Sequence, residues 1–173
     1  EIMPSLVGSE MCIRDRSDAP SLRARLRDFY DDYAFCLDEG RLEQWPDFFT
    51  EDCHYRVLSR ENHDAGLPLG LIYCMNRNMV RDRVTALRET TMFEPRSLRH
   101  FISGVRVMDV QGEHIVSQAN FAVMESLSDR EPTLNMVGRY LDVLRVTPDG
   151  IAINRRDCVY DNYRVRTSLI VPI

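Results

Sequence analysis

The hydrophobic pattern of this chain changes its period once, near residue 99. Before that point, apolar side chains recur every three or four positions, as they do on one face of an α-helix. After it they alternate with polar side chains, which is typical of strands with one buried face. Helices followed by a run of long strands predict an α+β fold, with helices packed on one face of a mostly antiparallel sheet.

The first half predicts a long helix that begins at residues 17–20, where capping residues precede a proline. Gly40 can end this helix in a left-handed cap. Six residues share its apolar face: Leu22, Leu26, Phe29, Tyr30, Tyr33 and Leu37. Five further segments come next, namely a helical elbow at 42–45, a strand at 53–58, a loop at 59–68, a short strand at 70–74 and a helix at 76–89.

The second half predicts four long strands, joined in part by tight turns. Gln111-Gly112 and the segment 147–150 (Thr-Pro-Asp-Gly) carry residues that favour chain reversal. The strands are expected at 101–110, 114–126, 133–146 and 151–164. The tail at 168–173 is apolar, and we expect it to be covered rather than to face water.

Residues 1–16 differ in composition from the rest of the chain and show no periodicity. We expect them to be a non-native or disordered leader, and residues 17–173 to form a single domain. Length and the 44% share of apolar residues fit one globular core. No apolar run is long enough to span a membrane, and a net charge of -5 argues against binding nucleic acid.

The chain has five cysteines, Cys12, Cys36, Cys53, Cys74 and Cys158. Their number is odd and no two have C-x-x-C spacing, so a disulfide scaffold is not expected. We interpret them as separate small apolar side chains in a reducing, cytoplasmic setting.

No metal or nucleophile motif is present. An iron–sulfur cluster of the two-Cys, two-His type needs C-x-H and C-x-x-H pairs, whereas Cys53 and His54 are adjacent. The other histidines, His63, His100 and His114, form no H-x-x-x-H pair. The G-x-S-x-G, G-x-G-x-x-G and P-loop signatures are also absent. We therefore expect no metal and no cofactor in this chain.

Acid–base chemistry is the catalytic alternative that the residues leave open. A pocket in an α+β fold can work with one Asp, His or Tyr on its wall. The candidates are Tyr30, Tyr33, Asp52, His54, Tyr55 and His100. They would suit a free-standing dehydratase or isomerase, although each can equally be a packing or turn residue.

Arginines are dense in the predicted strands. Arg99, Arg106, Arg139, Arg145, Arg155 and Arg156 alternate with acids such as Asp142 and Asp157. They either form a solvated outer face or contact another subunit, because guanidinium groups bind carboxylates in a two-pronged geometry.

Five stretches together resemble the small (β) subunits of Rieske-type aromatic-ring-hydroxylating dioxygenases. Residues 42–57 read LEQWPDFFTEDCHYRV, and the likeness continues through NHDAGLPLGLIY, MVRDRVTALRE and SLRHFISGVRV. It ends with GRYLDVLRVTPDGIAINRRDCVYDN at 138–162. The region around Trp45 and His63 looks most similar to the small subunits of terephthalate dioxygenase and salicylate 5-hydroxylase.

The resemblance implies a fold like that of nuclear transport factor 2, a cone of helices wrapped by a strongly curved sheet. It implies a large α subunit as partner, commonly in an α3β3 assembly, that carries a Rieske [2Fe–2S] cluster and a mononuclear iron. A reductase, sometimes with a ferredoxin, would supply electrons to that partner. The β subunit alone could form a homotrimer. The family assigns it no catalytic residues, which implies a structural role in aromatic, and more narrowly aromatic-carboxylate, catabolism.

Overall fold

The chain folds into one sheet with helices against it, as a computed structural model shows for residues 11–165, 169 and 171–173, with side chains from Ser21 onward. The elements in chain order are α1 (Met11–Asp38), η1 (Trp45–Phe48), β1 (Phe49–Ser59), α2 (Arg60–Asp64), β2 (Ile72–Cys74), α3 (Arg77–Glu89), β3 (Arg96–Gln111), β4 (His114–Leu127), β5 (Thr133–Thr147) and β6 (Gly150–Tyr160).

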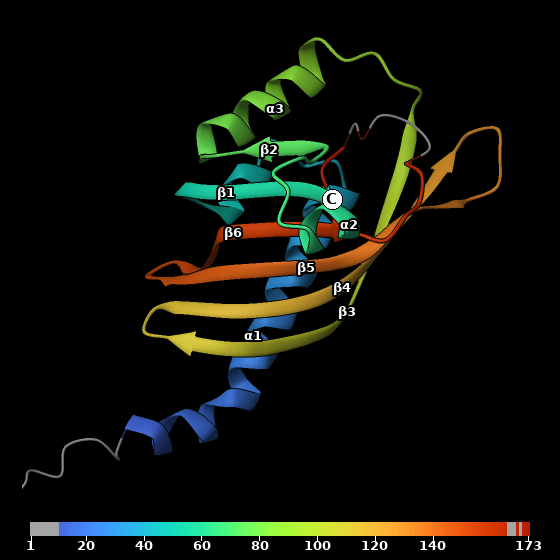
Figure 1. Cartoon of the computed structure of the whole chain (residues 1–173). Helices are drawn as coiled ribbons and strands as arrows, with labels where there is room; N and C mark the ends of the chain where they lie inside the picture. Colours follow the sequence, from blue (N-terminus) through green and yellow to red (C-terminus); the bar gives the residue numbers. More distant parts are fainter. Residues whose placement is uncertain (1–10, 166–168, 170) are drawn as a thin grey trace, which may run out of the picture.

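The six strands form a single curled sheet in the order β2-β1-β6-β5-β4-β3. The β1–β6 pair is parallel and the other four pairs are antiparallel. Figure 1 shows α1 crossing one face of the sheet and α3 lying beside β1 and β2. The predicted α+β class, with helices on a strongly curved and mostly antiparallel sheet, is confirmed.

Periodicity explains how α1 and the long strands meet. Leu26, Tyr30, Tyr33 and Leu37 lie on one side of α1 and are buried. In β4 every second residue from Ile115 to Val123 is buried, so that face of the strand supports the helix. The predicted helix end is also confirmed, because Gly40 adopts a left-handed φ of 65°.

A close approach of three residues fixes the middle of the sheet. Gly138 in β5 pairs with Phe121 in β4, and a Cβ on Gly138 would lie 2.9 Å from the Phe121 ring and 2.2 Å from the Val159 oxygen. The Phe121 ring stacks on Tyr140 with centroids 4.6 Å apart. A residue with no side chain is therefore required at 138 so that the aromatic rings can close over the strand.

Some predicted boundaries were wrong. The loop expected at 59–68 contains α2, whose first turn is capped by the Ser59 hydroxyl accepting from the Asn62 amide. The elbow expected at 42–45 is a 3₁₀ helix that begins at Trp45, with Pro46 in its first turn. β6 ends at Tyr160, four residues before the expected end, and α1 begins at Met11, before the helix start expected at residues 17–20.

Candidate functional site

The centre of the curled sheet contains a sealed polar cluster. Asp142 of β5 accepts two hydrogen bonds from Arg156 of β6, Nε to Oδ1 at 3.0 Å and Nη2 to Oδ2 at 2.6 Å. Tyr30 of α1 donates to the same Oδ2 at 2.6 Å and lies 3.0 Å from the Ser117 hydroxyl. The side chains of Arg156 and Asp142 are both fully buried. Buried charges persist only when paired and hydrogen-bonded, and this pair satisfies that condition.

Aromatic rings surround the guanidinium of this pair. The Arg156 Cζ lies 4.2 Å from the Tyr33 ring centroid and 4.3 Å from that of Tyr140. Burial by itself would lower the pKa of Arg156, but the Asp142 carboxylate together with Tyr33 and Tyr30 outweighs burial and holds that pKa well above its usual range. Burial raises the pKa of Tyr30 and Tyr140 well above the ordinary value. The guanidinium therefore stays charged and these phenols stay protonated.

The last residue of the chain enters the same interior. The main-chain oxygen of Ile173 accepts from the Tyr33 hydroxyl at 2.9 Å and from the Tyr55 hydroxyl at 3.0 Å. Ile173 is 1% exposed, and Figure 1 marks the chain end beside β1 and β6. Trp45 donates to the Tyr33 hydroxyl at 3.0 Å. The predicted burial of the apolar tail is confirmed for Pro172 and Ile173, while residues 168 and 170 lie outside the described part.

The predicted acid–base residues do not form one site. Tyr30, Tyr33 and Tyr55 point inward, but His54 is exposed because neighbours in β1 face opposite sides of the sheet. Asp52 is also exposed and accepts from Asn154. The hydroxyl groups of the inward tyrosines are committed to Asp142 and Ile173. No histidine therefore reaches the interior tyrosines from β1.

His100 lies in a separate contact at the end of α1. Its Nδ1 is 2.6 Å from Asp38 Oδ1, and its backbone amide also donates to that carboxylate. The His100 side chain is fully buried. This arrangement fastens the last turn of α1 to β3 and explains His100 as a structural residue.

The resemblance implies iron in the large partner subunit, and the described donors of this chain do not fit a metal site of their own. In the described residues, no group of three or more His, Cys, Asp or Glu side chains is placed to hold a metal. His54, His63 and His114 belong to three different elements, β1, α2 and β4.

The cysteines in the described part are free, buried thiols: Cys36, Cys53, Cys74 and Cys158. Burial raises the pKa of Cys36 to about 11 and that of Cys53 to about 12. A thiol protonated to that extent is a poor nucleophile, which favours a packing role. Cys12 lies outside the residues whose side chains are described.

The predicted arginine interface divides into three groups. Cross-strand register places four arginines on the outer face of the sheet, opposite the face that α1 covers: Arg106, Arg139, Arg145 and Arg155. Arg99 is exposed near the end of α1, 3.6 Å from Glu39. Arg156 has no exposed surface, so the prediction that it contacts another subunit was wrong. Arg156 faces inward because a bulge shifts the β5–β6 register between Val143 and Leu144. This shift changes which residues of β6 point toward α1.

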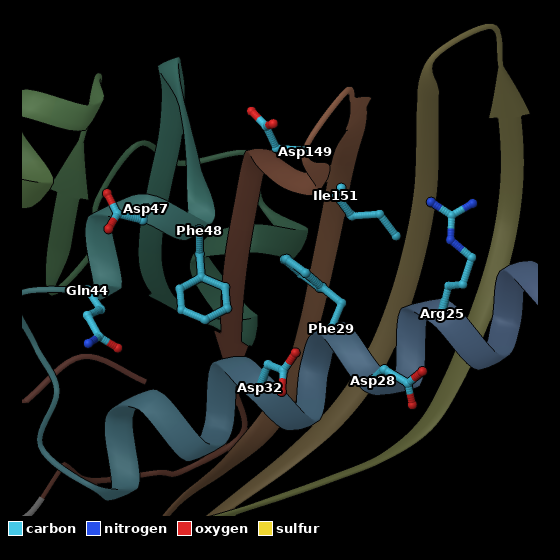
Figure 2. A pocket seen from close by; sticks show the side chains of 10 residues that line it. Arg25, Asp28, Phe29, Asp32, Gln44, Asp47, Phe48, Asp149 and Ile151 are labelled. Carbon is cyan, nitrogen blue, oxygen red and sulfur yellow. The ribbon is translucent and has the colours of Figure 1, made fainter.

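An open groove lies outside the interior, between α1, η1 and the β5–β6 turn, with a volume of 560 Å³. Figure 2 shows Phe29 and Phe48 between the helix and the hairpin, with Asp149 near the hairpin tip. The rings of Phe29 and Phe48 meet edge to face at 5.9 Å. Sequence reasoning did not find this groove, because its residues come from three segments and form no motif.

No described helix is long and apolar enough to cross a membrane. The fold and its occupied interior define a cone-shaped α+β domain of the nuclear transport factor 2 type. Residues 33–167 match the family described as ring hydroxylating beta subunit. The chain belongs to this family, as its sequence predicted.

Individual relatives agree with that assignment. The anthranilate 1,2-dioxygenase small subunit of Burkholderia cepacia is 39% identical over 137 residues, which cover 79% of this chain and 85% of the relative. The terephthalate 1,2-dioxygenase terminal oxygenase component subunit beta 2 of Comamonas sp. is 30% identical over 141 residues. These cover 82% of this chain and 92% of the relative. A solved Novosphingobium aromaticivorans structure, assigned as the β subunit of an aromatic-ring-hydroxylating dioxygenase, has a TM-score of 0.82 at 35% identity. The match covers 90% of this chain and 99% of that structure's chain.

Proposed function

We propose that this chain is the non-catalytic small subunit of an aromatic-ring-hydroxylating dioxygenase. Family membership places it in such an oxidoreductase. The observation that carries the non-catalytic role is the occupied interior, where Asp142 binds Arg156 and Tyr30, and the Ile173 oxygen accepts from Tyr33 and Tyr55. The redox chemistry would belong to a large subunit with a Rieske [2Fe–2S] cluster and a mononuclear iron, supplied with electrons by a reductase or ferredoxin.

The outer face of the sheet is the surface we propose for subunit contact. Arg106, Arg139, Arg145 and Arg155 project from neighbouring strands on that face. Apolar residues lie among them, including Val116 and Val143, which pair across β4 and β5 and are only partly buried. A mixture of arginine and apolar side chains is typical of protein interfaces.

We propose an α3β3 assembly whose β subunits can also associate as a homotrimer when alone, and a cytoplasmic location. The four described cysteines are reduced thiols, which suits a reducing compartment. The proposed substrate class is an aromatic carboxylate, because two of the relatives are named for anthranilate and terephthalate dioxygenases. The large subunit would choose among such substrates.

The free-standing dehydratase or isomerase is not favoured. That alternative needed a pocket with an Asp–His or Tyr pair, whereas His54 faces solvent and the hydroxyls of the inward tyrosines bind Asp142 and Ile173. The described acid–base candidates therefore lie in separate surroundings rather than around one reacting atom.

Co-expression with the large-subunit gene of the same operon tests the proposal. Affinity purification through a tag on this chain should recover the large subunit with its iron, and native mass spectrometry should give a 3:3 complex. The chain expressed alone should contain no stoichiometric iron. A chain that stays separate from every large subunit, or that holds iron by itself, would contradict the proposed function.

A further inference from the structure

Two polar atoms inside the curled sheet have no hydrogen-bond partner among the described residues. They are Nη1 of Arg156, in β6, and the hydroxyl oxygen of Tyr140, in β5. Both side chains are 0% exposed, so neither atom reaches the surrounding solvent. A buried polar group that forms no hydrogen bond destabilises the fold, and native proteins rarely contain one. Two such atoms in one interior therefore point to a ligand that bonds with them.

The two atoms belong to side chains that are in contact. The Arg156 Cζ lies 4.3 Å from the centroid of the Tyr140 ring. The other two guanidinium nitrogens, Nε and Nη2, both donate to Asp142, so Nη1 is the one that points away from this carboxylate. Nη1 can only donate, whereas the Tyr140 hydroxyl can donate and accept. The ligand must therefore accept from one atom and bond with the other.

Other polar groups lie around the same place. The Tyr33 ring centroid is 4.2 Å from the Arg156 Cζ and 6.3 Å from that of Tyr140. Burial is the main cause that raises the pKa of Tyr140, and electrostatic interactions with Tyr33 and Cys158 raise it further. These interactions indicate that Tyr33 and Cys158 lie close to the Tyr140 hydroxyl, so the surroundings of this hydroxyl are polar.

The charges in this interior favour a neutral ligand. Asp142 already neutralises Arg156, and both side chains are fully buried. The rings of Tyr33 and Tyr140 present their electron-rich faces to the same guanidinium. An anion would be repelled by Asp142 and by these faces, and a cation would be repelled by Arg156. Water is neutral and small, and it can both donate and accept, as buried waters in proteins do when they bond with such groups.

We propose that Arg156 and Tyr140 bind one structural water molecule in the interior of the subunit. The water accepts a hydrogen bond from Nη1 and bonds with the Tyr140 hydroxyl. It thus links β5 to β6 a second time, beside the ion pair of Asp142 and Arg156. This inference goes beyond the proposed function and does not depend on it, because the site consists only of residues of this chain.

A crystal structure of the full chain, grown from sodium bromide, tests the identity of the ligand. We expect electron density for one water within about 3.2 Å of both atoms, and no anomalous bromide signal there. A bromide peak at this position would show an anion site and overturn the proposal. A direct hydrogen bond between Nη1 and the Tyr140 oxygen, or the lack of any density beside them, would overturn it as well.

The variant Tyr140→Phe tests the site in solution, because it removes the hydroxyl and keeps the ring. If the hydroxyl binds water, its loss should raise the equilibrium constant for unfolding about fivefold. Magnetic relaxation dispersion of oxygen-17 water should then detect one long-lived internal water fewer. The control Tyr163→Phe makes the same change on a fully exposed ring and should alter neither value. A Tyr140→Phe chain as stable as the unmodified one, or with as many internal waters, would contradict the proposal.

Discussion

Arg156 and Asp142 form a two-pronged ion pair in the middle of the curled sheet, and neither side chain is exposed to solvent. Tyr30 adds a third hydrogen bond to the same carboxylate from α1. The pair thus links two strands to the helix that covers them. The interior of this subunit is thus filled by its own ion-paired and hydrogen-bonded side chains.

Replacing Arg156 with methionine should destabilise the chain by about 3–5 kcal/mol, because Asp142 is then left buried without its partner. The double variant Arg156→Met, Asp142→Leu should recover most of that loss, since it removes both charges. Urea unfolding followed by circular dichroism measures both values. A single variant as stable as the unmodified chain would show that the pair is not sealed from water.

Removing the hydroxyl of Tyr33 should cost about 1–3 kcal/mol, because the buried indole N–H of Trp45 loses its acceptor and the Ile173 oxygen loses one donor. Trp45 is the only tryptophan, so its fluorescence reports the change directly. The control is Tyr163→Phe, on a fully exposed ring, which should change stability by less than about 0.5 kcal/mol. Equal effects from the two variants would contradict the described path of the tail.

Adding a methyl group at Gly138 should destabilise the sheet by about 1–3 kcal/mol or more. A Cβ there would lie 2.2 Å from the Val159 oxygen and 2.9 Å from the Phe121 ring. The backbone must move, because the nearer atom is not on a side chain. Thermal unfolding of Gly138→Ala measures the effect, and a loss below about 0.5 kcal/mol would mean that the strands are not this close.

Protonation of Asp157 should contribute to the loss of folding stability in acid. Burial would raise the pKa of this carboxyl, but hydrogen bonds from Arg56 at 2.7 and 2.6 Å and from Arg155 outweigh it and lower the pKa. A carboxyl with a lowered folded pKa stabilises the fold above its unfolded pKa. That stabilisation is lost as the pH falls through the lower, folded value.

The contribution of Asp157 should therefore be complete above about pH 5 and decline below about pH 4. Asp157→Asn should cost about 1–3 kcal/mol at pH 7, where charged hydrogen bonds are lost, and should flatten the acid limb of a plot of unfolding free energy against pH. Arg56→Met, which removes two of the hydrogen bonds to Asp157, should instead move the acid-induced loss of stability to higher pH. An unchanged acid limb in both variants would exclude this role.

The sequence predicted the fold well where periodicity is strong. The face of α1 from Leu26 to Leu37 and the alternation in β4 were both visible, because one buried face repeats over many residues. α2 was missed because five residues are too few to show a helical period, and its signal was the single cap at Ser59. The end of β6 was missed because strand-forming residues, Tyr163 and Val165, recur shortly after Tyr160.

The interior was harder to predict than the fold. Asp142 and Arg156 looked like surface charges, yet Tyr140, Asp142 and Leu144 occupy alternate positions in β5 and so must share the inward face. That parity was the available signal for Asp142. Arg156 could not be placed in the same way, because the β5–β6 bulge changes the phase of β6. A bulge depends on tertiary geometry and has no reliable sequence signature here.

The most direct test of a supporting role is oxygen consumption coupled to ring hydroxylation, measured with anthranilate and with terephthalate in the presence of the cognate reductase. We predict no turnover by the purified chain alone, and turnover when the co-expressed large subunit is present. Turnover should also persist when Tyr55→Phe replaces the unmodified small subunit in that complex, since the Tyr55 hydroxyl is buried and bonded to the Ile173 oxygen. Product formation by the purified chain without any large subunit would contradict the claim that it supports catalysis instead of performing it.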